Sequence, residues 1–237
     1  MKKISILIFS LLLFVTFSYA QSLDEIIEKH HEAMGAKKLE SVKALVIEMN
    51  MMMMGMQATS KISVKRPNKV YSESQVMGQN IVQASNGESY WMTDPRTGKY
   101  MDMPEGQAKQ LLQNTQFLDG ALWNYKKKGN KVELLGKETI DGNVYHKLKV
   151  YQADLDMAVD FLIDANTYLI KFQRAQVSQG GITADVETDI ASYKSIEGIM
   201  FPEKIKINVN GAQQMSMDMT KVELNPQLPD SMFEKPE

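Results

Sequence analysis

Apolar and polar residues alternate with a period of two through most of this chain, which is the pattern of strands with one buried and one solvent-facing side. Ile62 and Val64, for example, alternate with Lys61, Ser63 and Lys65. Similar runs continue to the end of the chain, and no helix long enough for a crossover lies among them. Neighbouring strands must therefore run antiparallel.

The width of such a sheet determines its shape. About ten strands at roughly 4.8 Å spacing form a sheet on the order of 48 Å wide, and two short helices, expected at residues 23–34 and 104–114, are each about 10 Å across. They cover less than half of the apolar face, which would aggregate if it stayed flat and open. We therefore predict an α+β fold, in which a strongly curved antiparallel sheet forms an incomplete (half) β-barrel with short helices covering its mouth.

The first of these helices has clear start and stop signals. Ser22 and Glu25 form a capping box, and Gly35 ends the helix. His30, His31 and Met34 are spaced so that they meet near one face, where they are either metal ligands or ordinary residues of the apolar face.

The first twenty residues have the features of a secretory signal peptide. Lys2 and Lys3 precede an apolar run at residues 4–17, and Ser18-Tyr19-Ala20 provides a small-x-small cleavage site. We expect cleavage after Ala20, which leaves one exported, soluble domain at residues 21–237. The chain has no cysteine and a net charge of −2, so we expect no disulfide framework, no lipid anchor on an N-terminal cysteine and no nucleic-acid partner.

Methionine is unusually frequent, with 18 residues in 237. Unbranched thioethers adapt to irregular apolar shapes and are common at promiscuous binding surfaces. Six of them fall on the inward parity of two predicted strands: Met49, Met51, Met53, Met215, Met217 and Met219. They either line an apolar cavity or simply fill a core. A third possibility is Cu(I) binding, because thioethers are soft ligands.

Arg66 interrupts the alternation of its strand, because it falls on the apolar parity. Its guanidinium cannot lose its charge and needs carbonyl or carboxylate partners. Pro67 should end the strand immediately after it, at the rim of the sheet. Arg66 is therefore either a functional residue at the lip of an apolar surface or a side chain that reaches out to solvent.

The sequence Val64-Lys65-Arg66-Pro67-Asn68, together with the segment 85–91 (SNGESYW) and Asp94-Pro95, resembles the core of the LolA-type periplasmic carriers of outer-membrane lipoproteins. The resemblance implies a periplasmic half-barrel that shelters acyl chains. It also implies that Arg66 bonds to a helical lid and governs its opening. An inner-membrane transporter and an outer-membrane acceptor are the partners that it implies.

We therefore predict a monomeric carrier for lipoprotein or lipid acyl chains, with no cofactor, no metal and no catalytic residue. The chain contains no G-x-S-x-G elbow, P-loop, H-E-x-x-H motif or cysteine nucleophile. The alternatives are a Cu(I)-binding protein and a lipoprotein-sensing module that regulates a partner. The residues predicted to line the acyl cavity are Met49, Met51, Met53, Ile62, Val64, Trp91, Phe161, Met215, Met217 and Met219.

Three further interpretations follow from local patterns. Tyr168, Ile170 and Phe172 alternate, so we expect them to share one face. The run of three lysines at residues 126–128 is interpreted as the solvated tip of a hairpin. His146 lies on an apolar parity and is interpreted as a core histidine with a hydrogen-bond partner.

Overall fold

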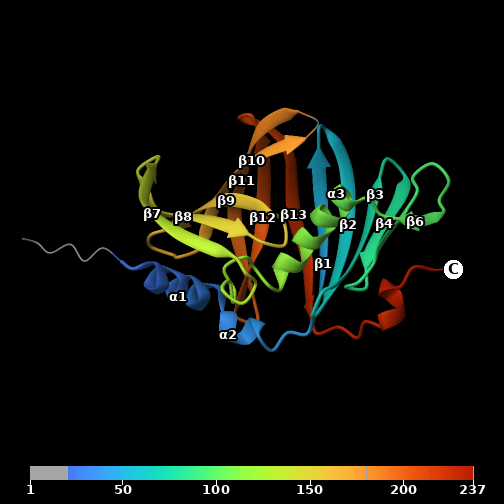
Figure 1. Cartoon of the computed structure of the whole chain (residues 1–237), viewed down its shortest axis with the longest axis horizontal. Coiled ribbons are helices and arrows are strands. Elements are labelled where there is room, and N and C mark those ends of the chain that lie inside the picture. The colour runs from blue at the N-terminus through green and yellow to red at the C-terminus, as the bar shows by residue number, and fades with distance from the viewer. Residues whose placement is uncertain (1–20, 180, 237) are drawn as a thin grey trace, which may run out of the picture.

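The computed structural model describes residues 21–179 and 181–236, so the predicted signal peptide lies outside the described residues. Within them, thirteen strands form one sheet in the order β6-β5-β4-β3-β2-β1-β13-β12-β11-β10-β9-β8-β7. Every pairing is antiparallel, as predicted, although the sheet has more strands than the ten expected. β6 and β7 are free edges, so the curved sheet does not close (Figure 1).

The strands are mostly joined by tight hairpins. Their bounds are β1 Ala44–Met53, β2 Met56–Lys65, β3 Lys69–Val76, β4 Gln79–Ser85, β5 Tyr90–Thr93, β6 Tyr100–Asp102, β7 Lys131–Ile140, β8 Asn143–Gln152, β9 Met157–Asp164, β10 Ile170–Gln179, β11 Ile182–Ile196, β12 Ile199–Val209 and β13 Ala212–Leu224.

Over the described residues, three short α-helices accompany the sheet: α1 (Leu23–Met34), α2 (Ala36–Leu39) and α3 (Glu105–Leu112), the last continued by the 3-10 segment η1 (Gln113–Phe117). The start and end predicted for the first helix are confirmed. The Ser22 hydroxyl accepts a hydrogen bond from the Glu25 backbone N–H at 3.2 Å, and Gly35 ends the helix with φ 72°. A further 3-10 segment, η2 (Asp230–Phe233), lies near the C-terminus.

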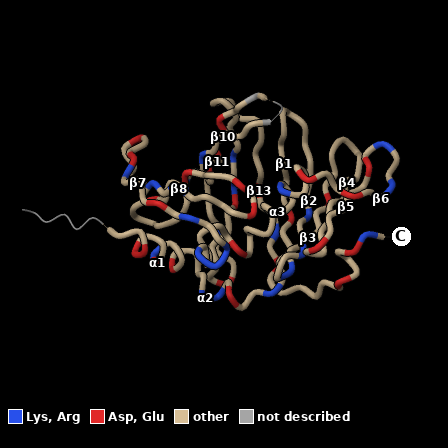
Figure 2. The backbone as a smooth tube through the Cα atoms, viewed as in Figure 1, with Lys and Arg blue, Asp and Glu red and all other residues tan. Residues whose placement is uncertain are grey.

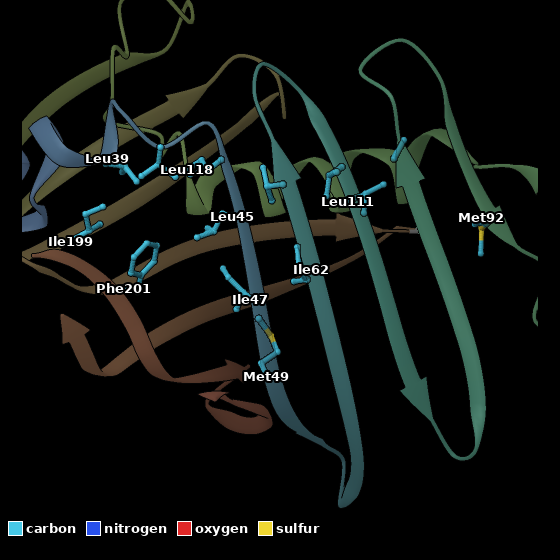
Figure 3. Packing of buried hydrophobic residues seen from close by; sticks show 14 of the residues in the cluster. Leu39, Leu45, Ile47, Met49, Ile62, Met92, Leu111, Leu118, Ile199 and Phe201 are labelled. Atoms are coloured by element: carbon cyan, nitrogen blue, oxygen red, sulfur yellow. The ribbon is translucent and has the colours of Figure 1, made fainter. Parts of the chain in front are cut away.

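The helices lie against one face of the sheet, which we call the inner face, and bury two separate clusters there. α3 and the residue after η1 cover the first cluster, in which Leu111 and Leu118 are buried together with side chains of β1, β2, β3 and β12 (Figure 3). α1 covers the second, where Ile26 and Ile27 pack on β8 and β9. No helix in the part of the chain that the structure describes is long and apolar enough to cross a membrane.

Two of the sequence predictions about faces are wrong. The register of β10 against β9 shifts between Ile170 and Phe172, and this irregularity sends Phe172 to the outer face, where its ring meets Tyr145 at 5.7 Å. Trp91 also lies on the outer face. It is buried there with Val82 and Ala84, and its indole N–H donates to the Phe233 carbonyl at 3.0 Å.

Candidate functional site

The six methionines predicted to point inward form three directly opposed pairs on neighbouring strands. Met49, Met51 and Met53 of β1 lie opposite Met219, Met217 and Met215 of β13. We call these six residues the methionine ladder. Side chains paired in this way have Cβ atoms about 4.5–5.5 Å apart, so the thioethers form a continuous apolar stripe along the centre of the sheet.

The ladder runs from covered to open. Met49 is 5% exposed and belongs to the cluster beneath α3, whereas the other five members are only half-buried. The apolar surface continues onto β12, where Ile205 pairs with Met217 and Ile207 pairs with Met215. Both isoleucines are also half-buried. We call the half-buried residues Met51, Met53, Met215, Met217, Ile205 and Ile207 the open face.

The remaining predicted cavity residues lie elsewhere. Ile62 and Val64 are buried with Met49 in the cluster beneath α3, and Phe161 is buried beneath α1. Trp91, on the outer face, is not brought together with the methionines. A groove of about 750 Å³ lies at the opposite end of β1, between Arg66 and the segment 225–229.

Arg66 follows β2 at that end, and its guanidinium joins two separate segments. Its Nε and Nη2 donate to the two carboxylate oxygens of Asp119, each at 2.9 Å, and Nη2 also donates to the Leu118 carbonyl at 3.1 Å. Its Nη1 donates to the carbonyl oxygens of Leu39 (3.0 Å), Glu40 (3.2 Å) and Val42. Arg66 thus links the end of the α3–η1 segment to the connection between α2 and β1.

Sequence reasoning missed two partners of this junction. Asp119 stands alone among the apolar residues Phe117, Leu118, Ala121 and Leu122, and an isolated charge in such a segment is the signal that could have identified it.

The second missed partner is Lys128, which is not part of a solvated hairpin tip as predicted. Its ammonium donates to the carbonyl oxygens of Asp119 at 2.6 Å and Gly120 at 3.1 Å. Burial lowers the pKa of Lys128, and the nearby Arg66 charge acts in the same direction, while Asp119 opposes both. Two cations therefore hold the turn that follows η1.

Two of the three histidines, His30 of α1 and His146 of β8, contact Tyr168. His30 donates from Nδ1 to the Tyr168 carbonyl at 2.8 Å, and burial lowers the pKa of His30 to about 4. The His146 ring stacks on Tyr168 with centroids 5.9 Å apart. His146 is buried at 2% exposure, as predicted for a core histidine, but its Nε2 has no hydrogen-bond partner among the described residues.

The alternative that His30, His31 and Met34 hold a metal gains no support from the geometry. The His31 ring meets the edge of Trp123 at 5.0 Å. In the described residues, no three His, Cys, Asp or Glu side chains come together in a way that could hold a metal ion. His30 instead bonds α1 to the Tyr168 backbone between β9 and β10.

Comparison with solved structures identifies the fold. A LolA superfamily protein from Nitrosomonas europaea aligns with 91% of this chain and 99% of its own length, at 16% identity and a TM-score of 0.59. A putative outer membrane lipoprotein-sorting protein domain from Vibrio parahaemolyticus aligns with 88% of this chain and 97% of its own, at 11% identity and a TM-score of 0.59. The chain therefore has the LolA-type fold that the sequence motif implied.

A third solved structure, a DUF1329 family protein from Desulfovibrio piger, has the same fold, with 12% identity, a TM-score of 0.58 and coverage of 88% of this chain and 97% of its own.

The family is given by sequence comparison. No curated protein matches this chain by sequence. A family model described as an uncharacterized protein matches residues 65–237, and the chain belongs to that family.

Proposed function

We propose that this protein is a periplasmic carrier that shelters lipid acyl chains, of a lipoprotein or of a free lipid, against the open face of its half-barrel. The observation that carries the proposal is the methionine ladder. Five of its six members are apolar, mutually opposed and only half-buried, and they lie on the inner face beside the clusters that the helices cover. Half-exposed apolar surface of this extent is unusual unless something binds to it.

The side-chain chemistry suits this cargo. Acyl chains are flexible and irregular, and methionine can adjust three torsions to follow them. Ser60 and Ser74 lie beside the ladder on the inner face, where the Ser74 hydroxyl donates a hydrogen bond of 2.9 Å to the Ser60 hydroxyl, so one of the two hydroxyl protons is already paired within the protein. The fold of the LolA superfamily supports the same class of ligand by analogy.

The covered part of the inner face supports a movable lid. The α3–η1 segment is held by buried apolar residues such as Leu111 and Leu118 and by the Arg66 junction. We propose that this segment moves aside when cargo extends from the open face into the covered cluster. Arg66 is then the polar latch of the empty protein.

The test is acyl-chain binding by matched variants of adjacent methionines. Met51 points inward on the open face, whereas Met52 points outward and is 38% exposed. Mature protein is titrated with a fluorescent long-chain fatty acid. Met51→Glu should weaken binding at least about tenfold, because an unpaired carboxylate on an apolar surface is costly, and Met52→Glu should bind like the parent.

Equal binding by the two variants, with both folded, would refute the proposal. The same proteins test the Cu(I) alternative in a competition titration. Tight stoichiometric Cu(I) uptake that is lost when Met51 and Met53 are replaced by leucine would favour a metal-handling protein instead. Mass spectrometry of molecules that co-purify with the mature protein distinguishes a lipoprotein from a free lipid.

A further inference from the structure

We propose that the hairpin end of the half-barrel docks on the surface of an electrically neutral lipid bilayer through two methionine-tipped turns. Met54, between β1 and β2, is 75% exposed, and Met77, between β3 and β4, is 77% exposed. The register of β2 with β3 pairs Ala58 with Val76, so both turns lie at the same end of the sheet. We call the two turns, Met54–Gly55 and Met77–Gly78, the rim (Figure 1).

Methionine is an unexpected residue at these positions. Met54 and Met77 have φ of 49° and 52°, and each is followed by a glycine with positive φ, as in two-residue hairpin turns that favour asparagine or aspartate. The same chain uses those residues at equivalent turns, Asp141–Gly142 and Asn210–Gly211. The rim therefore presents an exposed apolar side chain twice where turn geometry favours a polar one.

The rim and its neighbouring hairpins are also free of charge. Residues 49–60, 74–87, 175–184 and 207–217 contain no Asp, Glu, Lys or Arg, although such residues make up 24% of the chain. The described residues of these ranges lie at the tips of the β1–β2, β3–β4, β10–β11 and β12–β13 hairpins. In Figure 2 the tips of the β1–β2 and β3–β4 hairpins carry no charged colour, whereas the loop between β5 and β6 does.

An uncharged tip suits a bilayer, because a charged side chain entering the lipid is penalised and a methionine is not. The rim also differs from a typical protein interface, whose anchors are aromatic residues and arginine packed in a broad surface. Met54 and Met77 instead stand on separate projecting turns, flanked by glycine and uncharged residues. A bilayer fits this arrangement better than a folded partner.

The rim lies next to the open face. Met53 of the ladder immediately precedes Met54, and the Met54 N–H donates to the Gln214 carbonyl at 3.0 Å, beside Met215. If the proposed function holds, on which this step rests, a docked rim places the mouth of the open face at the bilayer. An acyl chain then passes between the two without crossing water.

The experiment is flotation of the mature protein with neutral phosphatidylcholine vesicles. The double variant Met54→Asn with Met77→Asn removes both apolar tips and supplies the residue that these turns favour, so folding is retained. Leu135→Asn is the control, because Leu135 is 45% exposed on β7, away from the rim. We expect the parent and the control to float, and the double variant to lose at least about tenfold in vesicle binding.

Binding should persist at about 0.5 M NaCl, because it does not depend on surface charge. The proposal is overturned if the parent does not float with neutral vesicles, if the double variant floats equally well, or if binding requires anionic lipid and is lost in salt. A parent that captures a stoichiometric protein partner but no vesicle likewise overturns it.

The fatty-acid titration separates this proposal from the proposed function. A double variant that loses vesicle binding but still takes up fatty acid supports both. If the unmodified protein floats with vesicles but takes up no fatty acid, membrane docking through the rim is supported and the carrier function is refuted. If the unmodified protein takes up fatty acid but does not float with vesicles, the carrier function is supported and membrane docking through the rim is refuted.

Discussion

Replacing Arg66 by leucine should make the protein hold acyl cargo more firmly. Arg66 makes three hydrogen bonds to the segment that follows η1, two of them to the Asp119 carboxylate and one to the Leu118 carbonyl. In our proposal these bonds are broken when the lid moves aside for cargo. Arg66 therefore stabilises the state that competes with binding.

The size of the effect follows from these contacts. A hydrogen bond to a charged group contributes roughly 1.5–3 kcal/mol net. The side chains of Arg66 and Asp119 are 18% and 26% exposed, so water competes for them and the three bonds do not add fully. We take about 3 kcal/mol for the whole junction, which shifts the open–closed equilibrium by roughly a hundredfold.

This shift appears directly in the apparent affinity, because the apparent dissociation constant is the intrinsic one divided by the fraction of protein that is open. Arg66→Leu should therefore release cargo up to about a hundredfold more slowly. Arg66→Lys should be intermediate, since lysine keeps the charge but cannot form the two parallel bonds to Asp119. The assay is transfer of a fluorescent lipopeptide from loaded protein to acceptor vesicles.

The matched control is Arg96→Leu, which removes an exposed arginine from the loop between β5 and β6. Thermal unfolding of each variant shows whether the fold is intact, because Arg66 also holds the carbonyl oxygens of Leu39, Glu40 and Val42. Transfer by folded Arg66→Leu at the parental rate would refute the latch.

Three further predictions concern stability. Burial lowers the pKa of His30 from 6.5 to about 4, so as the pH drops the unfolded chain takes up the proton before the folded protein does, and the free energy of unfolding should fall by about 3 kcal/mol between pH 6.5 and 4. Urea titrations across this range should give a weaker pH dependence for His30→Gln than for the unmodified protein. Leu118→Ala should cost about 2–5 kcal/mol, because Leu118 is fully buried, and an unchanged urea midpoint would contradict its place in the core. Trp91→Phe should cost about 1–3 kcal/mol by leaving the Phe233 carbonyl unpaired, which differential scanning calorimetry would detect as a lower Tm.

Local signals predicted the elements of this fold well. The capping box at Ser22 and the stop at Gly35 define α1 because both act within one turn of the helix. The alternation of β1 predicted which of its residues point inward, because a period of two leaves no other choice once one face is buried. The antiparallel arrangement followed from the lack of crossover helices.

What the sequence could not predict depends on contacts between distant residues. Trp91 and Met92 are adjacent and both apolar, so nothing in β5 indicates which one faces outward; the outer face is covered there by Phe233, 142 residues further along. Phe172 changed face because of a single irregularity in register. Asp119 became recognisable as a partner of Arg66 only when the fold brought them together.

The two free edges of the sheet give the half-barrel a mechanical property that a closed barrel lacks. In a closed barrel the number of strands and their stagger fix the diameter, so the interior has one volume. Here the chain of hydrogen-bonded strands ends at β6 on one side and at β7 on the other. The sheet can therefore widen or tighten by small changes in twist between neighbouring strands without breaking any hydrogen bond between them. For the carrier proposed above, we expect such bending to let one sheet fit acyl cargoes of different thickness.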